Sequence, residues 1–333
     1  MSKSPHSGHS MPSLANASKA QARALKISAW LTGIYFIIEM AIGIYTGSVA
    51  VISDAFHTFS AVGGVLVAIF ASRIAGRVAT SSKTFGWYRA EIIGALVNGV
   101  FLLVMAILVI YMGLMRLGSP IELPTGPMLW AAAGGLVTEL ISLYLLTREK
   151  SNDLNMRGAF WHVMQTFVGS VLIIVAALVI EFTGFLAIDP ILGTAFGFVL
   201  LWASWGIIRD AMHLLMEGTP DDMELPHVIM ALSELEGVAD VHHVHAWALT
   251  SGRYVFSTHL LLDKTDKVKP DTVLRAAHKL LKEDFGFYFA TVQVETTRME
   301  EQHAQEIDVK EIDVKSEETE TPDKPGSTSH QGH

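Results

Sequence analysis

The chain has 333 residues, of which 50% are hydrophobic and only 17% are charged. Soluble domains carry about 25% charged residues, so this composition favours a membrane protein. The formal net charge of −9 argues against nucleic acid as a partner, because nucleic-acid-binding proteins present a basic face. The absence of cysteine excludes disulfides, thiolate zinc sites and thiol nucleophiles.

Residues 1–24 are polar and Ser-rich, without the apolar stretch of a signal peptide, and we expect a disordered cytosolic segment. A helix needs about 20 mostly apolar residues to cross the lipid bilayer. Six later stretches meet this requirement and together predict a six-helix transmembrane domain over residues 25–208. The predicted spans are 25–46, 49–72, 89–113, 127–147, 158–182 and 189–208.

The basic residues predict an orientation for this domain. Lys and Arg lie before the first span and in the loops between spans two and three and between spans four and five. The loops on the other side carry only Arg116. Because basic residues stay on the cytoplasmic side, both termini are expected in the cytoplasm of a multi-pass membrane protein.

After Arg209 the pattern becomes that of a soluble protein, and residues 209–297 are predicted to form a cytosolic α+β domain. The order helix–strand–strand–helix–strand suits a small ferredoxin-like domain. Its expected elements are a helix at Met223–Leu235, strands at Val238–Leu249 and Tyr254–Leu262, a helix at 270–284 and a strand at Ala290–Thr297. Residues 298–333 are acidic, contain a tandem EIDVK repeat and are predicted to be a disordered tail.

Ionisable side chains inside the spans need a reason, because each costs about 2.5–3.5 kcal/mol at mid-membrane. Asp54 and His57 are three residues apart and share a helical face, as do His162 and Thr166, four apart. Two inward imidazoles with nearby carboxylates indicate a metal-ion path, with zinc as the first candidate. For other polar groups, such as Glu91 and Asn98, hydrogen bonds between helices are the simpler interpretation. The predicted spans also contain Glu39, Glu139 and Gln165.

At these residues the sequence resembles the cation diffusion facilitator family, in its zinc/cadmium/cobalt efflux branch. The resemblance runs from about Ala24 to Glu295 and implies a homodimer that exports a divalent metal from the cytosol in exchange for protons, by alternating access. It also suggests a bacterial inner membrane. The stretches that carry it are TGSVAVISDAFHTFS (46–60), TFGWYRAEIIGALVN (84–98), LNMRGAFWHV (154–163), MEGTPDDMEL (216–225) and VADVHHVHAWALTSG (238–252).

One departure from the family pattern concerns the transport site. The resemblance implies a His-x-x-x-Asp pair on the second span and another on the fifth; the histidines match as His57 and His162, but Ala61 and Thr166 replace the aspartates. Two neutral imidazoles would leave a dication uncompensated in a low-dielectric site. Our hypothesis is therefore that Asp54, Glu139 or both restore the charge, with Thr166 as at most a weak ligand.

Proton exchange follows from the same groups. Histidine titrates near pH ~6.5 and must be neutral to bind metal, so metal entry displaces protons. Two alternatives stay open: a member of the fold with altered or lost transport that regulates or binds metal, and a transporter of a different cation. An enzyme is not expected, because the chain has no HExxH, nucleophile or phosphate-loop motif, and no resident cofactor is expected beyond bound or transported Zn²⁺.

The cytosolic domain holds a second candidate metal site. His242 and His259 fall at positions where the family has histidines, which implies a regulatory metal at a dimer interface, but Phe289 replaces a further family histidine. His245 is three residues from His242, so on a regular strand their side chains would point to opposite faces. A bulge would be needed to bring them to the same face.

Overall fold

The computed structural model forms two compact units that divide between Leu215 and Met216, and each is described by itself. Of the predicted disordered segments, residues 1–18 and 300–333 lie outside the described part. The structure describes residues 19–119, 121–148, 154–220, 223–250, 252–264 and 268–299, with the side chains of 19–26, 28–29, 61–62, 64–66, 68–69, 72, 146–148 and 154–162 excepted.

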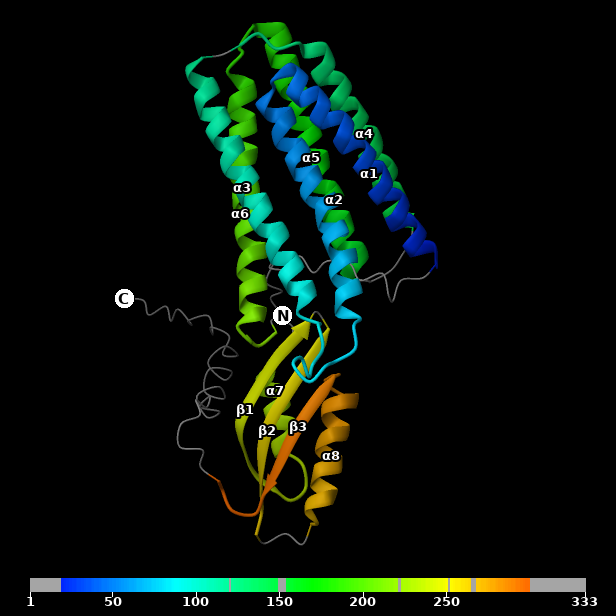
Figure 1. Cartoon of the computed structure of the whole chain (residues 1–333), viewed down its shortest axis with the longest axis vertical. Coiled ribbons are helices and arrows are strands. Elements are labelled where there is room, and N and C mark those ends of the chain that lie inside the picture. Colours follow the sequence, from blue (N-terminus) through cyan, green and yellow to red (C-terminus); the bar gives the residue numbers. More distant parts are fainter. Residues whose placement is uncertain are drawn as a thin grey trace, which may run out of the picture. The chain divides into compact units, whose positions relative to one another are not determined.

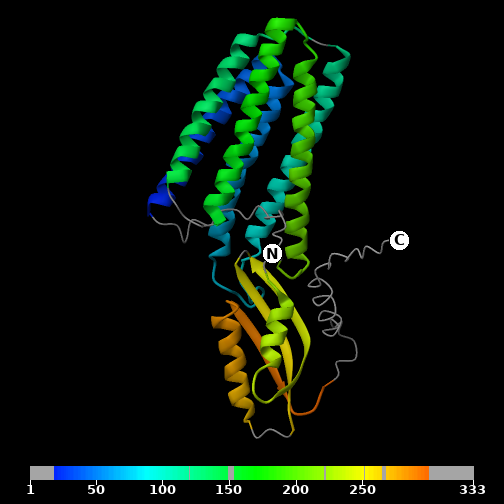
Figure 2. The same cartoon turned by 180° about the vertical axis from the view of Figure 1, so that it is seen from behind.

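The first unit is a bundle of long helices (Figures 1 and 2). Within the described residues, α3, α4, α5 and α6 each contain a segment long and apolar enough to cross a membrane, and α1 contains a shorter apolar helix at Trp30–Thr46. The predicted helical membrane domain is therefore confirmed. The bounds are α1 Lys19–Thr46, α2 Val49–Ala75, α3 Ala90–Gly118, α4 Thr125–Arg148, α5 Leu154–Thr183 and α6 Ile188–Leu215.

The helices continue beyond the apolar stretches of the sequence. α1 begins at Lys19, so part of the segment 1–24 that was predicted to be disordered is helical. The run KAQARA at its start is rich in strong helix formers, and apolar length alone does not detect such a polar helical turn. α6 likewise runs on to Leu215, past the last apolar residues of its predicted span.

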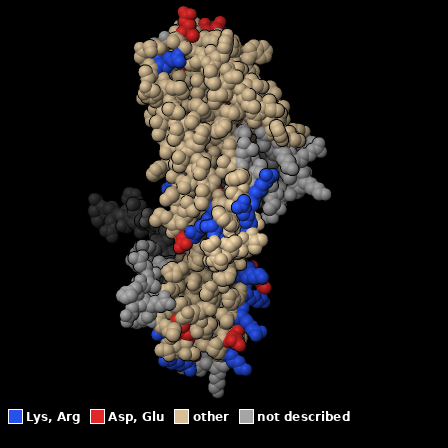
Figure 3. All heavy atoms as spheres, viewed as in Figure 1, with Lys and Arg blue, Asp and Glu red and all other residues tan. Residues whose placement is uncertain are grey.

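Large apolar side chains cover the outside of this bundle. Trp30, Trp130, Phe182 and Trp202 are each more than 70% exposed. On the face seen in Figure 3, charged side chains are scarce along the middle of the helices and gather toward their ends. Such a surface is expected where lipid, not water, surrounds the helices.

Small residues let the helices pack closely in the interior. At Gly113 of α3, a Cβ added to the glycine would lie 1.9 Å from the Thr194 hydroxyl of α6, so no larger residue fits there. Close approach through small residues is the usual means of helix association in membranes, where the hydrophobic effect does not drive helices together.

A buried carboxylate joins α2 to α6. Asp189, at the start of α6, is fully buried and accepts hydrogen bonds from the backbone N–H of Val49 (2.8 Å) and of Ala50 (3.3 Å). The Ser48 hydroxyl also donates to it. Asp189 thereby satisfies N–H groups that the first turn of α2 would otherwise leave without partners.

The second unit is a three-stranded sheet with two helices. β1 pairs with β2 in antiparallel and β2 with β3 in parallel orientation, and α8 makes the crossover (Figure 1). α7 and α8 pack on one face of the sheet around Val244, Phe256 and Leu281. This confirms the predicted α+β domain. The bounds are α7 Leu225–Ser233, β1 Val238–Thr250, β2 Arg253–Leu262, α8 Pro270–Glu283 and β3 Phe289–Glu295.

Candidate metal sites

Asp54 lies in the interior of the helical unit, where α2 meets α5. Its side chain is 1% exposed, and neither carboxylate oxygen accepts a hydrogen bond of regular geometry from the described residues. Gly169 of α5 makes room for it, because a Cβ at that position would lie 1.9 Å from Asp54 Oδ1. Gly169 thus leaves space for the Asp54 carboxyl group, and within the described part the Glu39 carboxyl group is a side-chain hydrogen-bond partner for it.

Glu139 reaches the same region from α4. It is 4% exposed, and Ser170 of α5 donates a hydrogen bond of 2.9 Å to its Oε1, while Oε2 has no described partner. Its carboxyl group lies close enough to that of Asp54 for electrostatic interaction. The structure therefore brings together the two carboxylates that the sequence proposes as charge compensation.

A polar pocket lies beside Glu139, with a volume of about 280 Å³ that includes space open to solvent. Thr166 of α5 is buried at its wall and donates a hydrogen bond of 2.9 Å to the Val163 carbonyl. The hydroxyl oxygen keeps lone pairs, so Thr166 remains a candidate weak ligand. The lining residues are Thr32, Tyr35, Thr58, Thr138, Glu139, Ser142, Val163 and Thr166.

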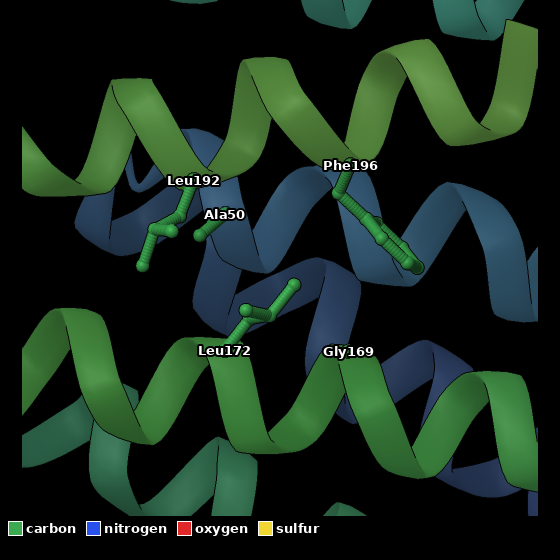
Figure 4. A pocket seen from close by; sticks show the side chains of 5 residues that line it. All are labelled: Ala50, Gly169, Leu172, Leu192 and Phe196. Carbon is green, nitrogen blue, oxygen red and sulfur yellow. The ribbon is translucent and has the colours of Figure 1, made fainter. Parts of the chain in front are cut away.

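His57 follows Asp54 by three residues on α2 and is 7% exposed. Its ring packs edge-on against the Phe196 ring of α6, with centroids 5.7 Å apart. Phe196 also borders an apolar gap of about 160 Å³ between α2, α5 and α6, lined in addition by Ala50, Gly169, Leu172 and Leu192 (Figure 4). His57 thus has an apolar neighbourhood toward α6.

The remaining residues of the predicted transport site can be placed only along the backbone. His162 lies on α5, one helical turn before Thr166, and Ala61 lies on α2, one turn after His57. The side chains of both residues are outside the described part. The described carboxylates Asp54 and Glu139 are thus the members that the structure brings together.

Glu39 of α1 is a buried acid to which the sequence assigned no role. It is fully buried, and the Thr58 hydroxyl of α2 lies 3.4 Å from its Oε2 as donor. Its carboxyl group interacts electrostatically with both Asp54 and Glu139. A carboxylate in the middle of an apolar span is the signal that could have identified it.

In the second unit, a bulge in β1 rearranges the histidines. His242 pairs with His259 of β2, but His245 pairs with Ser257, so β1 has one extra residue between them. His243 takes up that residue with a left-handed φ of 52°. Because His259 and Ser257 share a face of β2, the bulge places His242 and His245 on one face of the sheet.

His242, His259 and Glu295 form a cluster on the sheet, all buried, whose ligand atoms lie within 4.8 Å of one another. His259 Nδ1 is 3.0 Å from Glu295 Oε1, and His242 Nε2 is 3.4 Å from Glu295 Oε2. Two imidazoles and a carboxylate are a donor set that suits Zn²⁺. The sequence analysis predicted the two histidines but missed Glu295, which lies at the end of β3, the strand that pairs with β2 and its His259. Phe289, at the start of β3, is exposed.

The Glu295 carboxylate is held by donors as well as by imidazoles. Burial alone would raise its pKa, but hydrogen bonds from the Met299 N–H (2.9 Å) and the Gln293 amide (2.8 Å), together with the two histidines, lower the pKa below its ordinary value. The carboxylate is therefore kept in the ionised form that a metal requires.

A helical membrane unit with buried acids, followed by a small α+β unit with a His–His–Glu cluster, suits a membrane protein that handles metal cations. Comparison with known families agrees. The cation efflux transmembrane domain matches residues 25–216, and the cation efflux cytoplasmic domain matches residues 220–297. The chain belongs to the cation efflux, or cation diffusion facilitator, family, which is a family of transporters and not of enzymes.

Curated relatives cover most of the chain. It is 35% identical over 280 residues to the metal cation efflux system protein CzcD of Cupriavidus metallidurans, covering 84% of this chain and 88% of that protein. It is 33% identical over 280 residues to a cadmium, cobalt and zinc/H(+)-K(+) antiporter of Bacillus subtilis, covering 83% and 90%. It is 30% identical over 277 residues to the zinc transporter ZitB of Escherichia coli, covering 82% and 87%.

Proposed function

We propose that this protein exports a divalent metal cation, with zinc as the first candidate, from the cytosol in exchange for protons. The observation that carries the proposal is that two buried carboxyl groups interact electrostatically inside a helical membrane domain: that of Asp54, one turn before His57 on α2, and that of Glu139 on α4. Isolated charges in such a place are costly unless paired, and a dication compensates two of them at once.

The proposed transport site comprises Asp54 and His57 of α2, Glu139 of α4, and His162 and Thr166 of α5. Asp54 and Glu139 supply the two negative charges that aspartates at positions 61 and 166 would supply elsewhere in the family. Thr166 is the weakest member, because its hydroxyl hydrogen is committed to the Val163 carbonyl. The imidazole and carboxylate donors favour zinc and other first-row dications.

Proton exchange follows from ligand chemistry. Imidazole must be neutral and carboxylates deprotonated before they bind metal, so metal entry releases protons and protons arriving from the other side favour metal release. The relative in Bacillus subtilis, named as a zinc/H(+)-K(+) antiporter, supports exchange as the mode of transport.

For the topology we propose six spans over residues 25–208 in a bacterial inner membrane, with both termini and the domain at 209–297 in the cytoplasm. The distribution of basic residues supports this orientation, and bacterial relatives support the location. We also propose a homodimer, which the match to the cytoplasmic domain of the family supports.

In the cytosolic domain, we propose that His242, His259 and Glu295 form a metal-sensing site. The distances within the cluster and the lowered pKa of Glu295 support metal binding there. A site outside the transport path can report the metal level to the transport domain only if occupancy and transport are coupled.

A competing function is metal binding or regulation without transport. The observation that favours it is the loss of both family aspartates, at Ala61 and Thr166. A different cargo cation is the third interpretation, since an oxygen-richer site suits harder cations than zinc.

The decisive experiment is zinc uptake by the purified protein in liposomes with an acidic lumen, followed with a zinc indicator inside the vesicles. We expect uptake that falls when a protonophore removes the pH gradient and that is lost in His57→Ala and in His162→Ala. Uptake that both variants leave unchanged would show that the site assignment is wrong. Zinc binding without uptake would favour the regulatory function, and uptake of Co²⁺ or Mn²⁺ alone would favour a different cargo.

A further inference from the structure

We propose that Glu39 of α1 is a further cation-binding residue of the membrane site, so that the site draws carboxylates from α1, α2 and α4. This inference rests on the transport function proposed above. It adds to the ligand set of that site. Among the described residues, a divalent cation would be bound by three carboxylates and by His57, so oxygen ligands would outnumber nitrogen ligands.

The position of Glu39 supports this role. Its side chain is fully buried, and it interacts electrostatically with Asp54 on the adjacent helix and with Glu139 on α4. Thr58, which donates to Glu39 Oε2, is itself at the wall of the polar pocket that Glu139 lines. Glu39 therefore belongs to the same cluster as the two acids already assigned to the site.

The hydrogen bonding of the cluster is incomplete. Four carboxylate oxygens have no hydrogen-bond partner of regular geometry among the described residues: Glu39 Oε1, Asp54 Oδ1, Asp54 Oδ2 and Glu139 Oε2. The carboxyl groups of Glu39 and Asp54 lie close enough to share a hydrogen bond when one of them carries a proton. The described ion pairs include none of these three acids, so no Lys or Arg in the described part neutralises them. Buried carboxylates without basic partners are costly unless a proton or a bound cation neutralises their charge, and protons are exchanged for metal in the function proposed above.

A neutral group independently points to a ligand. The Ser142 hydroxyl, one turn from Glu139 on α4, is 1% exposed, lines the polar pocket and has no described hydrogen-bond partner. A buried hydroxyl that faces a polar pocket is usually satisfied by a water or by a ligand shell. Ser142 thus gives the pocket a hydroxyl group that can donate or accept a hydrogen bond, in addition to the three acids.

The contact with Thr58 connects Glu39 of α1 to the proposed ligands on α2. Thr58 directly follows His57 on α2, so its hydroxyl ties the α1 carboxylate to the helix that carries Asp54 and His57. Carboxylate oxygens suit harder dications such as Mn²⁺, whereas imidazole nitrogen suits Zn²⁺. A third carboxylate should therefore raise the affinity of the site for Mn²⁺ relative to Zn²⁺, compared with a histidine-rich site.

The test is Co²⁺ binding by the purified full-length protein in a His242→Ala/His259→Ala background, which removes the cytosolic cluster. The affinity is measured by equilibrium titration and the ligand field by the visible absorption of bound Co²⁺. We expect Glu39→Gln to weaken Co²⁺ binding at least about tenfold and to shift the Co²⁺ bands, because a ligand is lost. Glu181→Gln, the same change at an exposed acid of α5, should alter neither.

Affinity and absorption bands in Glu39→Gln that equal those of Glu181→Gln would overturn the inference. If Glu39→Gln does not fold, Glu39→Asp is the variant to test, because it keeps the charge but shortens the side chain by one methylene. Unchanged Co²⁺ binding and absorption in Glu39→Asp also overturns the inference. The proposed function fails separately, if the unsubstituted protein takes up no metal or if His57→Ala transports normally. Uptake that depends on His57 but Co²⁺ binding that is indifferent to Glu39 would reject only the role of Glu39.

Discussion

The two units bring imidazole and carboxylate together in opposite ways. In the sheet, both oxygens of Glu295 accept hydrogen bonds, from Gln293 and from the Met299 N–H, and both also face a histidine. In the helices, Asp54 accepts no regular hydrogen bond within the described part, and Glu139 accepts one at one of its oxygens. The sheet cluster is organised by protein donors, whereas the acids of the helix cluster have few donors within the described part, which is the arrangement that our proposed ion site requires.

These two arrangements suit two different functions, steady binding of a metal and its transport. A carboxylate fixed by donors keeps its geometry with or without metal, which suits steady binding. Carboxylates that lack donors are stabilised mainly while a cation is present, so the protein around them has reason to rearrange when the cation leaves. Binding followed by release is what transport requires. The predictions below test this contrast, from the largest expected effect to the smallest.

The first prediction concerns the ligands in the helices. His57→Ala and Glu139→Gln should each lower the initial rate of metal uptake into liposomes by more than about 100-fold, because a directly bound ligand should matter more than an outer-shell partner. The His242→Ala variant, which changes the sheet cluster only, should retain uptake within about tenfold. If Glu139→Gln transports like the unsubstituted protein, the charge of Glu139 is not needed.

The second prediction tests the space that Gly169 leaves for Asp54. Gly169→Ala should displace the Asp54 carboxylate, because the added Cβ would lie 1.9 Å from Oδ1. Overpacking of this kind costs about 1–3 kcal/mol, and we expect uptake to fall roughly tenfold or more. Gly206→Ala on α6 is the matched control, since a Cβ there meets no atom within 4 Å. Equal uptake by the two variants would show that the position of Asp54 is unimportant.

The third prediction concerns Glu295. Glu295→Gln should weaken zinc binding to the cytosolic cluster about tenfold or more, measured by titration of a His57→Ala protein. Because the folded-state pKa of Glu295 is lowered, its charge contributes stability that is fully present above pH ~4.5 and is lost as the pH falls through the lowered folded value. The stability difference between the variant and the parent should therefore shrink in acid. A difference that grows in acid would contradict the sign of this pKa shift.

The smallest effect is expected at the bulge of β1. His243 has a left-handed φ of 52°, so His243→Gly should be more stable than His243→Ala by about 1 kcal/mol. At His245, which is not among the positive-φ residues, alanine should be the more stable of the two. Thermal unfolding of the four variants measures both differences, and the same order at both positions would mean that the bulge carries no backbone strain.

The elements of this protein follow largely from sequence pattern, but its sites follow only in part. Long apolar runs and alternating strands predict the helices and the α+β order, since these periods reflect burial directly. The face on which His242 and His245 meet was not predictable, because the extra residue of a bulge leaves no periodic signal. Glu295 was missed for a related reason, because β3 brings it beside His259 from a distant part of the sequence. Glu39 is visible in the sequence as an acid within a predicted span, but the sequence does not show that it faces Asp54.

The hydrogen bonds of Asp189 have a consequence for movement. Because this α6 residue holds the first N–H groups of α2, α2 cannot slide along its own axis without either taking α6 with it or breaking those bonds and leaving a buried carboxylate without donors. Asp54 and His57 belong to the same rigid rod, a few residues further along. The position of Asp54 and His57, two of the ligands we propose, along the bundle is thus fixed by Asp189, which is not among the proposed ligands.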